Sequence, residues 1–471
     1  METPASRRAA LIAVTMMSFA SPFMLSGVNI GLPAIGREFA ASAVLLTWMS
    51  TAYSLATAIL LLPAGKLADI HGRKRLFVIG VSIYTLASVL CALAPSAPVL
   101  IAFRVIQGFG AAMIFATSTA ILTSIYPANE RGRVLGVNTA AVYLGLSAGP
   151  FLGGMIVEAL GWRAVFWINV PLAAMALAYT LTRVTGEWAD SPDDRFDWRG
   201  SMIYALALVG LIVGFGQLPA LRGAWIIVAG LLFGALFLRY QQRAASPLLD
   251  LGIFRGNRVF TMSSLAALVN YAATASVTFL MSLYLQYIKA LTPREAGLIL
   301  VAQPIVQTIF SPLAGRISDR VEARYVASLG MGFTVTGIVM LTVLTPETSL
   351  PYIIACLLVL GFGFALFSSP NVSALMGAVE RRHYGVASGL MGTMRTFGQM
   401  LSMGMVMILF SITMGQAQIT PETYTGFMTA TRTAFIISAI LCALGVVASL
   451  TRGKNVLANR PSPEPAPAPR T

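Results

Sequence analysis

Long apolar runs separated by short polar breaks repeat along the whole chain of 471 residues. A helix needs about 20 apolar residues to cross a bilayer, and about fourteen windows meet this length. They cover residues 10–34, 43–64, 76–95, 98–124, 134–157, 164–183, 200–219, 224–241, 258–287, 296–315, 324–345, 350–372, 384–411 and 431–451. Because lipid offers no partners to backbone N–H and C=O groups, each run is expected to form a helix. The pattern predicts an all-α membrane protein with about 14 transmembrane helices.

The basic residues predict how these helices are oriented. If both ends of the chain are cytoplasmic, 24 of the 32 Lys and Arg residues fall in inner segments, six in outer segments and two within spans. Such an excess on the cytoplasmic side follows the positive-inside rule and requires an even number of spans. We therefore expect a multi-pass protein of the cytoplasmic (inner) membrane. The net charge of +14 is spread over these loops, which favours anionic lipid headgroups of the bilayer over nucleic acid as its partner.

Composition narrows the class of function. The chain is 57% hydrophobic and 11% charged, whereas soluble proteins carry about 25% charged residues. Its three cysteines lie in apolar windows and its two histidines in separate turns, so we expect neither a disulfide framework nor a metal site. The sequence contains no phosphate-binding G-x-x-x-x-G-K-[ST] loop and no nucleophile elbow. It disfavours an enzyme or an ATP-driven pump, and we expect no cofactor.

Two turns of similar sequence divide the chain into related halves. Residues 63–69 read Pro-Ala-Gly-Lys-Leu-Ala-Asp and residues 311–320 read Ser-Pro-Leu-Ala-Gly-Arg-Ile-Ser-Asp-Arg, with Gly and Asp four positions apart in both. Internal repeats of this kind are typical of transporters built from two related bundles. We expect a six-helix bundle over 1–183, a cytoplasmic linker with two inserted helices over 184–257 and a second six-helix bundle over 258–451. The proline-rich tail, 452–471, is expected to be disordered and cytoplasmic.

The turn between the second and third runs carries the most informative motif. Residues 65–76 read Gly-Lys-Leu-Ala-Asp-Ile-His-Gly-Arg-Lys-Arg-Leu. This segment resembles the signature loop of the major facilitator superfamily of secondary transporters, G-x-L-a-D-r-x-G-r-k-x-x-l. The glycines permit a tight turn, and the basic cluster holds that turn on the cytoplasmic side.

Further motifs extend the resemblance along the chain. Residues 104–110, Arg-Val-Ile-Gln-Gly-Phe-Gly, resemble R-x-x-q-G-x-G, and residues 145–154, Gly-Leu-Ser-Ala-Gly-Pro-Phe-Leu-Gly-Gly, resemble the G-x-x-x-G-P-x-x-G-G signature of antiporters. Trp162-Arg163, residues 166–171 and residues 197–200 are similar to elements of the fourteen-helix drug:proton antiporter family. The resemblance implies a major-facilitator fold of two six-helix bundles plus two inserted helices, and proton antiport by alternating access.

The resemblance also assigns candidate residues for proton coupling or gating: Asp69, Arg73, Arg104, Gly149, Pro150 and Glu158. In the family the loop Asp latches the cytoplasmic side against a helix N-terminus of the other bundle, here residues 384–388. Arg104 is expected near the proton path. Gly149 and Pro150 allow the fifth helix to bend while the bundles repack, with static packing as the alternative. For Asp69 the alternative is a solvated loop charge.

One position departs from the family pattern. The Asp that the family carries in its first helix falls on Met24, and the middle of every predicted span lacks Asp and Glu. Proton coupling usually needs a buried group whose pKa differs between conformations. Glu158, at the outer end of the fifth helix, and Glu38, just outside the first, are the available substitutes. The missing carboxylate also favours a neutral or anionic substrate over a lipophilic cation.

Polar residues in the central helices are the candidate substrate ligands. In this architecture the first and fourth helices of each bundle face the centre, here the first, fourth, ninth and twelfth. The candidates for substrate binding are Asn29, Gln107, Asn270, Tyr271, Gln303, Asn371 and Arg395, with Gln307 and Tyr53 as further ones. Arg395 lies about eleven residues into the thirteenth helix, roughly 16 Å along it and near the midplane. Hydrogen bonding between helices is the alternative role for all of these residues.

Together these features predict a secondary active transporter that exports hydrophobic or amphipathic small molecules, as multidrug efflux proteins do, by proton-coupled antiport. The alternative is a uniporter, or a dedicated exporter of a single neutral or anionic metabolite, without proton coupling. We expect a monomer whose partners are a small-molecule substrate, protons and the lipid bilayer.

Overall fold

The computed structural model describes residues 4–127, 130–244, 246–249, 251–254, 256–318, 320–379 and 384–453, apart from the side chains of residues 132, 384–386 and 388. Within them every regular element is a helix. The long helices are α1 (Pro4–Glu38), α2 (Ala43–His71), α3 (Arg73–Ala92), α4 (Ala97–Ile125), α5 (Arg131–Leu160), α6 (Arg163–Arg183), α7 (Trp198–Gln217), α8 (Leu221–Gln241), α9 (Arg258–Leu283), α10 (Pro293–Leu300), α11 (Ala302–Ser318), α12 (Ala323–Leu341), α13 (Leu350–Gly377), α14 (Tyr384–Thr413) and α15 (Tyr424–Leu450). Short turns η1 (Leu251–Phe254), η2 (Tyr284–Ile288) and η4 (Pro421–Thr423) complete the described secondary structure.

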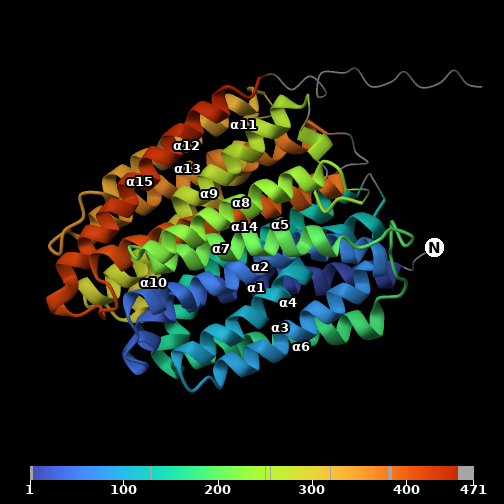
Figure 1. Cartoon of the computed structure of the whole chain (residues 1–471). Helices are drawn as coiled ribbons and strands as arrows, with labels where there is room; N and C mark the ends of the chain where they lie inside the picture. The colour runs from blue at the N-terminus through green and yellow to red at the C-terminus, as the bar shows by residue number, and fades with distance from the viewer. Residues whose placement is uncertain are drawn as a thin grey trace, which may run out of the picture.

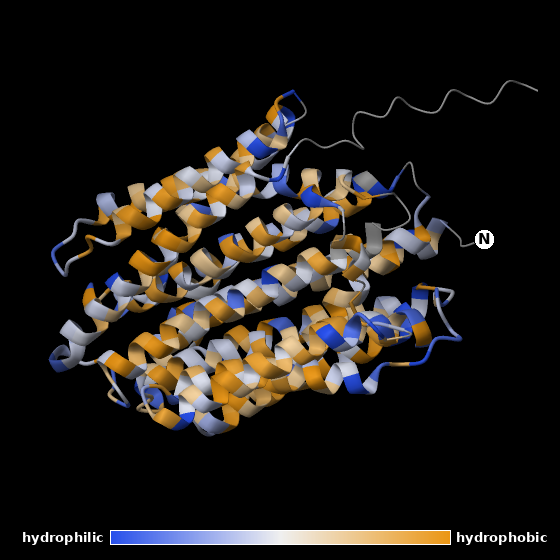
Figure 2. Cartoon of the chain, turned by 45° about the horizontal axis from the view of Figure 1, so that its top comes forward, coloured by the Kyte–Doolittle hydropathy of each residue, from blue (hydrophilic) through white to orange (hydrophobic). Residues whose placement is uncertain are grey.

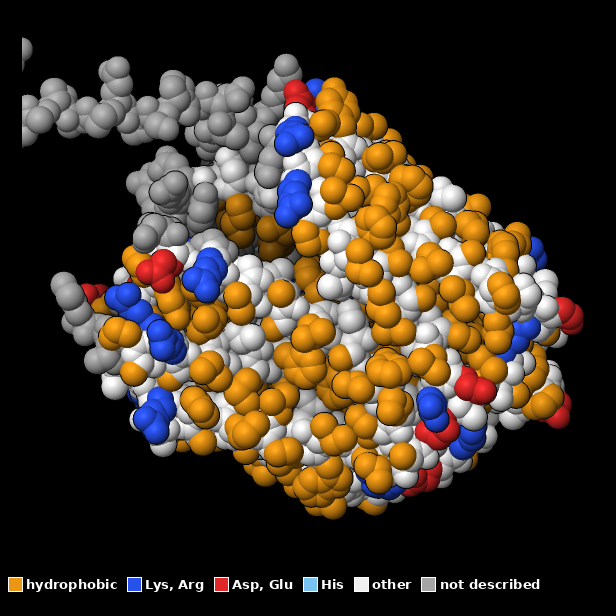
Figure 3. All heavy atoms as spheres, turned by 180° about the vertical axis from the view of Figure 1, so that it is seen from behind, with side chains coloured by type: hydrophobic (Ala, Val, Ile, Leu, Met, Phe, Trp, Pro, Cys, Tyr) orange, Lys and Arg blue, Asp and Glu red, His pale blue; other side chains and the backbone are white. Residues whose placement is uncertain are grey.

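Fourteen candidate membrane spans are found in the described residues, which confirms the predicted all-α fold with about fourteen transmembrane helices. The tenth span joins α10 and α11, which are separated at Val301. Pro304 explains this break, because proline lacks the backbone N–H and its ring conflicts with the carbonyl group of Leu300, four residues earlier. Hydrophobic residues dominate the middle of the molecule (Figure 2), and charged side chains gather toward its two ends (Figure 3).

The helices form two bundles of six spans with a helix pair added at their side (Figure 1). Helices α1–α6 pack together, as do α9–α15, and α7 and α8 pack mainly on each other. α1 begins and α15 ends at the same end of the molecule, here called the terminal face, and the opposite end is called the far face (Figure 1).

The start of the added pair is fixed by Asp197, which belongs to one of the sequence motifs. Its carboxylate caps α7 by accepting the backbone N–H of Gly200 at 2.8 Å. The same carboxylate accepts hydrogen bonds from Gln241 Nε2 at 2.9 Å and from the Tyr240 hydroxyl at 3.1 Å, both at the end of α8. The motif therefore joins the first turn of α7 to the last turn of α8.

The pair lies along the side of the molecule where α2 and α14 meet. The Tyr204 hydroxyl on α7 donates to the carbonyl group of Ala58 on α2 at 3.1 Å. Nearer the far face, the Ser411 hydroxyl on α14 donates to the carbonyl group of Leu218, directly after α7. Helix α7 is thus bonded to both bundles. The expected disordered tail lies outside the described residues from position 454 onward.

Candidate functional site

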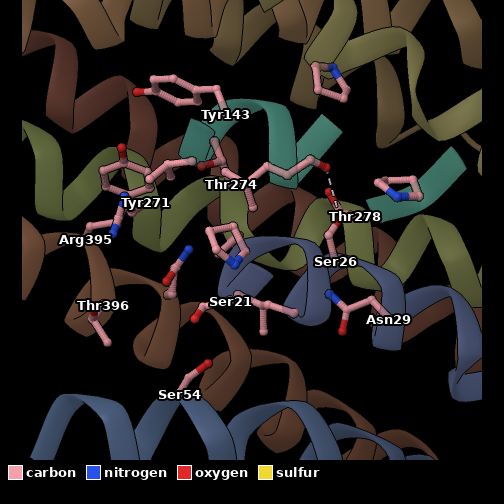
Figure 4. Close-up of a pocket in the computed structure, with 18 of the residues that line it drawn as sticks. Ser21, Ser26, Asn29, Ser54, Tyr143, Tyr271, Thr274, Thr278, Arg395 and Thr396 are labelled. Carbon is pink, nitrogen blue, oxygen red and sulfur yellow. Dashed lines mark hydrogen bonds between the residues drawn. The ribbon is translucent and has the colours of Figure 1, made fainter. Parts of the chain in front are cut away.

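A central cavity lies between the two bundles and encloses about 1260 Å³ of empty space, its mouth included. Its wall combines apolar side chains with a few polar groups, as the sites of small organic molecules in proteins do. The lining comes from both bundles: Ser21, Pro22, Leu25, Ser26 and Asn29 of α1, Tyr53, Ser54 and Thr57 of α2, Phe115 of α4, Val142, Tyr143, Leu146 and Pro150 of α5, Tyr271, Thr274, Ala275 and Thr278 of α9, Leu300 of α10, Gln303, Pro304 and Gln307 of α11, Phe364 of α13, and Arg395, Thr396 and Gln399 of α14. Figure 4 shows the polar members of this set converging on one space.

Four of the seven predicted substrate ligands line this cavity. They are Asn29, Tyr271, Gln303 and Arg395, and the two further candidates, Gln307 and Tyr53, line it as well. Helices α1 and α9 contribute as the architecture predicts, whereas α4 and α13 each contribute one phenylalanine. The threonines of α2 and α9 and the serines of α1 also face the cavity, although sequence reasoning did not select them. Hydroxyl groups of this kind are common in membrane helices and give no signal that separates a ligand from a packing residue.

Gln107 lies inside the first bundle, where it supports Arg104. Gln107 Oε1 accepts from Arg104 Nη1 at 2.7 Å, and Gln107 Nε2 donates to Ser88 Oγ at 2.8 Å. Arg104 Nε also donates to the carbonyl group of Met49 at 3.2 Å, and its guanidinium carbon lies 4.4 Å from the Tyr53 ring centroid. The described residues place no carboxylate in an ion pair with Arg104, so this fully buried cation is held by neutral groups and an aromatic ring.

Asn371 and Asn270 lie inside the second bundle, away from the cavity lining. Asn371 Nδ2 donates to the carbonyl group of Ser263 at 3.2 Å, and its Oδ1 accepts from Arg452 Nη1 at 3.0 Å. Asn270 is fully buried, and neither of its amide atoms has a hydrogen-bond partner within the described chain. The geometry of Asn371 is that of a hydrogen bond between helices.

Arg452 is a buried cation that sequence reasoning missed, because it directly follows the last apolar run and was assigned only to topology. Its guanidinium group also donates to Ser449 Oγ at 3.1 Å and to the carbonyl group of Ala323 at 3.0 Å. Burial lowers the pKa of Arg452 to about 10, and repulsion from Arg324 acts in the same direction. Arg452 therefore links the ends of α12, α13 and α15 at the terminal face.

Arg395 is the one Lys, Arg, Asp, Glu or His side chain among the described residues that line the cavity. It reaches from α14 across the bundle interface, so that its guanidinium carbon lies 5.8 Å from the ring centroid of Phe115 on α4. It is drawn next to Tyr271 in Figure 4.

Hydrogen bonds between the bundles close the far face where α1 meets α9. The Ser282 hydroxyl donates to the carbonyl group of Asn29 at 2.8 Å, and Gln286 Nε2 donates to that of Ile30 at 3.0 Å. Both donors are buried. Beside them, the backbone N–H of Ala43 donates to the carbonyl group of Ala417 at 3.1 Å. These bonds join the two bundles at that end of the cavity.

Helices α5 and α10 close the far face on the other side. Glu158 Oε2 accepts the backbone N–H of Arg294 at 3.1 Å, at the start of α10. A carboxylate is favoured there by the partial positive charge of a helix N-terminus. A Cβ atom added at Gly297 would overlap the carbonyl oxygen of Pro150, so the two helices pack backbone to backbone. Pro150 and Glu158 therefore lie at an interface between the bundles, on the helix expected to bend.

Gly149 and Glu38, in contrast, make contacts within the first bundle. A Cβ atom at Gly149 would lie 2.5 Å from Ser26 Cβ, which explains the small residue by the close packing of α5 on α1. Glu38 forms an ion pair with Arg163 at 2.7 Å and accepts a hydrogen bond from Trp162 Nε1 at 2.8 Å. The Trp-Arg element of the sequence thus fixes the far end of α1.

The signature loop at the terminal face is held by the segment that follows α6. Arg73 pairs with Asp69 at 2.9 Å and also with Asp190. Glu187 accepts the backbone N–H groups of Lys74 at 2.8 Å and Arg75 at 3.0 Å, and so caps the start of α3. The partner expected for Asp69, the N-terminus at residues 384–388, has most of its side chains outside the described residues.

A second ion pair extends this contact to the added helix pair. Lys66 pairs with Asp194, which also accepts from Ser246 Oγ at 3.2 Å in the segment after α8. The hydrogen bond from Lys66 lowers the pKa of the Asp194 carboxyl group below its usual range. Sequence reasoning treated this acidic segment as a linker, whereas the structure folds it onto the loop.

The cavity is less tightly closed toward the terminal face. On the space-filling surface a hollow is visible between the two bundles at this end (Figure 3). Gly136 of α5 and Gly389 and Gly392 of α14 have open space where a Cβ atom would lie, at the terminal ends of cavity-lining helices. Among the described side chains, one hydrogen bond crosses the interface there, between the hydroxyl groups of Tyr143 and Ser368.

Comparison with known proteins agrees with this architecture. The model of the Major Facilitator Superfamily matches residues 14–263 and again residues 263–470. The riboflavin transporter RibZ of Clostridioides difficile (strain 630) is 28% identical over 93% of this chain and 95% of its own length. The multidrug resistance protein Stp of Mycobacterium tuberculosis (strain CDC 1551 / Oshkosh) is 33% identical over 79% of this chain and 70% of its own.

A solved structure shares the fold. The bacterial homolog of the human lysosomal transporter Spinster, in its inward-facing and unoccupied conformation, aligns over 98% of this chain and 100% of its own with a TM-score of 0.67 at 15% identity. The family match covers both bundles, each with its own copy of the repeat. The chain belongs to the major facilitator superfamily of transporters.

Proposed function

We propose that this protein exports hydrophobic or amphipathic small molecules from the cell by alternating access. The observation that carries the proposal is the central cavity, lined by both bundles and closed at the far face by hydrogen bonds between them. A carrier that rocks around a fixed central site has one side closed in each of its two end states. The similarity to a multidrug resistance protein supports efflux as the direction of transport.

The terminal face is the cytoplasmic side in this proposal. The Lys and Arg residues of the signature loop and of the segment after α6 lie there, in agreement with the positive-inside rule. The structure then corresponds to a carrier loaded from the cytoplasm, and both termini lie on that side of the inner membrane. One chain supplies both walls of the cavity, which supports a monomer as the working unit.

Proton antiport is the proposed energy source, and Glu158 is the proposed proton-coupling carboxylate. Its carboxylate bridges the bundles at the closed face, so protonation would weaken a bond that exists only while that face is closed. Glu38 is less suited to this role, because its ion pair with Arg163 lies within one bundle and is not broken when the bundles separate.

Reconstituted protein tests the proposal directly. Liposomes that contain the purified protein and a lumenal pH indicator receive an imposed proton gradient and then cationic, neutral or anionic aromatic compounds. Substrate-triggered proton movement is expected for an antiporter. A substrate flux that does not depend on the proton gradient would contradict proton coupling. If none of the compounds is transported, the export of small amphipathic molecules is contradicted.

The alternative is a uniporter, or a dedicated exporter of a single neutral or anionic metabolite. Two observations favour it: the described cavity lining contains no carboxylate, and a relative named for riboflavin transport matches nearly the whole chain. Competition separates the two functions. A multidrug exporter is inhibited by many unrelated apolar compounds, whereas a dedicated exporter responds to one chemical family.

A further inference from the structure

Two guanidinium groups lie at or behind the cavity wall, and neither has a carboxylate partner among the described residues. Arg104 stacks on the Tyr53 ring from within the first bundle. Tyr53 itself lines the cavity. Its hydroxyl group has no hydrogen-bond partner within the described residues. Arg395 lines the same cavity from the second bundle. The described lining of the cavity therefore carries one positive charge, that of Arg395, and no negative charge.

The N–H donors of Arg395 have no acceptor within the described part of the chain. Among the residues that the structure describes, none accepts a hydrogen bond from this guanidinium group and none forms an ion pair with it. A guanidinium group has five N–H donors in a planar fork that matches a carboxylate. A charge left unpaired at membrane depth is costly, so it is retained where it serves a ligand or an ion path.

The surroundings of Arg395 are aromatic. Phe115 lies against the guanidinium group at 5.8 Å, and Tyr271 lies beside it, from the first and second bundle respectively (Figure 4). Phe364 also lines the same cavity. Aromatic rings prefer offset-stacked or edge-to-face contacts with other rings, so these walls favour a ring system in the substrate. An aliphatic chain gains no such geometric preference.

Building on the export function proposed above, we propose that the cavity selects aromatic organic anions and that Arg395 binds their acidic group. The ring system then lies among Phe115, Tyr271 and Phe364, while the Tyr53 hydroxyl group donates to the same acidic group or to a neighbouring carbonyl oxygen. Because Arg395 belongs to the second bundle and Phe115 to the first, the bound anion contacts both bundles at once. Its departure is thereby linked to their relative motion.

Two dyes built on the same xanthene ring test this selectivity. Fluorescein carries an acidic group and is anionic, whereas rhodamine 6G carries the same type of ring as a cation. Binding of each dye to the full-length protein in lipid nanodiscs is measured by fluorescence anisotropy. We expect fluorescein to bind at least about tenfold more tightly than rhodamine 6G, and Arg395→Gln to remove that preference, because a charge-assisted hydrogen bond is lost.

Two variants control for charge and for folding. Arg395→Lys keeps the charge without the planar fork and is expected to retain part of the fluorescein affinity. Arg239→Gln removes one exposed positive charge at the end of α8, outside the cavity, and is expected to bind both dyes as the wild type does. Thermal unfolding shows whether each variant remains folded. If Arg395→Gln does not fold, the fluorescein affinity of Arg395→Lys still tests the site.

The proposed anion site and the proposed export function are contradicted by different results. Equal fluorescein affinity in the wild type and Arg395→Gln, tighter binding of rhodamine 6G, or no binding of fluorescein would each overturn the proposed anion site. Transport of rhodamine 6G or of a neutral compound by liposomes that do not transport fluorescein would leave the export function standing while rejecting this site.

Discussion

The hydroxyl groups of Tyr143 on α5 and Ser368 on α13 form a hydrogen bond across the interface between the two bundles. Among the described residues, the other side-chain hydrogen bonds that cross this interface lie at the far face, for example those of Ser282 and Gln286. Tyr143 also lines the central cavity. Tyr143 therefore lines the cavity and also joins the two bundles toward the terminal face.

Removing this bond should open the terminal face further. A hydrogen bond contributes about 0.5–1.5 kcal/mol net, so Tyr143→Phe is expected to raise the open population by roughly twofold to tenfold. A cysteine placed at Gly392 reports this change through its rate of reaction with a water-soluble thiol reagent. The three native cysteines are buried and give little background. Tyr179→Phe, on an exposed surface of α6, is the matched control; equal rates in both variants would argue against a gating bond.

The contact of α5 with α10 should not tolerate a methyl group. In Gly297→Ala the new Cβ atom overlaps the carbonyl oxygen of Pro150, so the two helices must separate and the far face cannot close fully. Transport activity in liposomes is expected to fall about fivefold or more, because overpacking costs about 1–3 kcal/mol and 1.4 kcal/mol corresponds to a factor of ten. Gly332→Ala is the control, because nothing lies within 4 Å of its Cβ position. A fully active Gly297→Ala protein would mean that this contact is not part of the seal.

Replacing Glu158 should abolish proton coupling without abolishing substrate transport. Glu158→Gln keeps the size of the side chain but removes its charge and its ability to bind a proton, so downhill exchange of substrate is expected to continue while substrate-driven proton movement is lost. The loss of the charge at the α10 N-terminus also weakens the closed far face by about 0.3–1 kcal/mol. Lumenal pH recordings made alongside counterflow of labelled substrate test both effects. Proton movement at the wild-type rate in Glu158→Gln would exclude this carboxylate as the coupling group, and Glu38→Gln is the comparison variant.

Arg452 should contribute to stability more than to recognition. Arg452→Ala removes donors to the partly buried carbonyl group of Ala323 and to Asn371 Oδ1, and leaves the buried Asn371 Oδ1 without this partner. The expected loss is about 1–3 kcal/mol of unfolding free energy per unsatisfied group, with little change in substrate affinity. Thermal unfolding and dye binding in nanodiscs measure the two quantities separately. Arg432→Ala, whose exposed side chain bonds one carbonyl group at 2.9 Å, is the matched control.

The sequence predicts the helices of this protein far better than the face that each helix turns toward the cavity. Apolar length alone locates the spans, because a bilayer requires it. Within a membrane, however, both the lipid-facing and the buried side of a helix are apolar, so periodicity does not show which polar residue faces the centre. Gln107 and Asn371 illustrate this: both are polar and on expected central helices, and both bond inside their own bundle.

The contacts that the loops make with distant helices could not be predicted from the sequence either. Glu187 lies far from Lys74 in sequence, and nothing in its acidic segment indicates that it caps α3. In contrast, Arg395 was found from its depth alone, because a charge near the middle of a span is unusual enough to be informative by itself.

The position of α7 makes the two sides of this transporter unequal. Two facing bundles form two lateral seams, where α2 meets α14 and where α5 meets α11. In the described chain α7 is fastened across the first seam, to Ala58 on one bundle and Ser411 on the other, whereas no added helix covers the second, and Ala314 is the one buried residue named for α11. The seam between α2 and α14 is therefore held by a third element, whereas α5 and α11 meet without one. A molecule dissolved in the bilayer would meet a seam covered by α7 on one side and a seam without an added helix on the other.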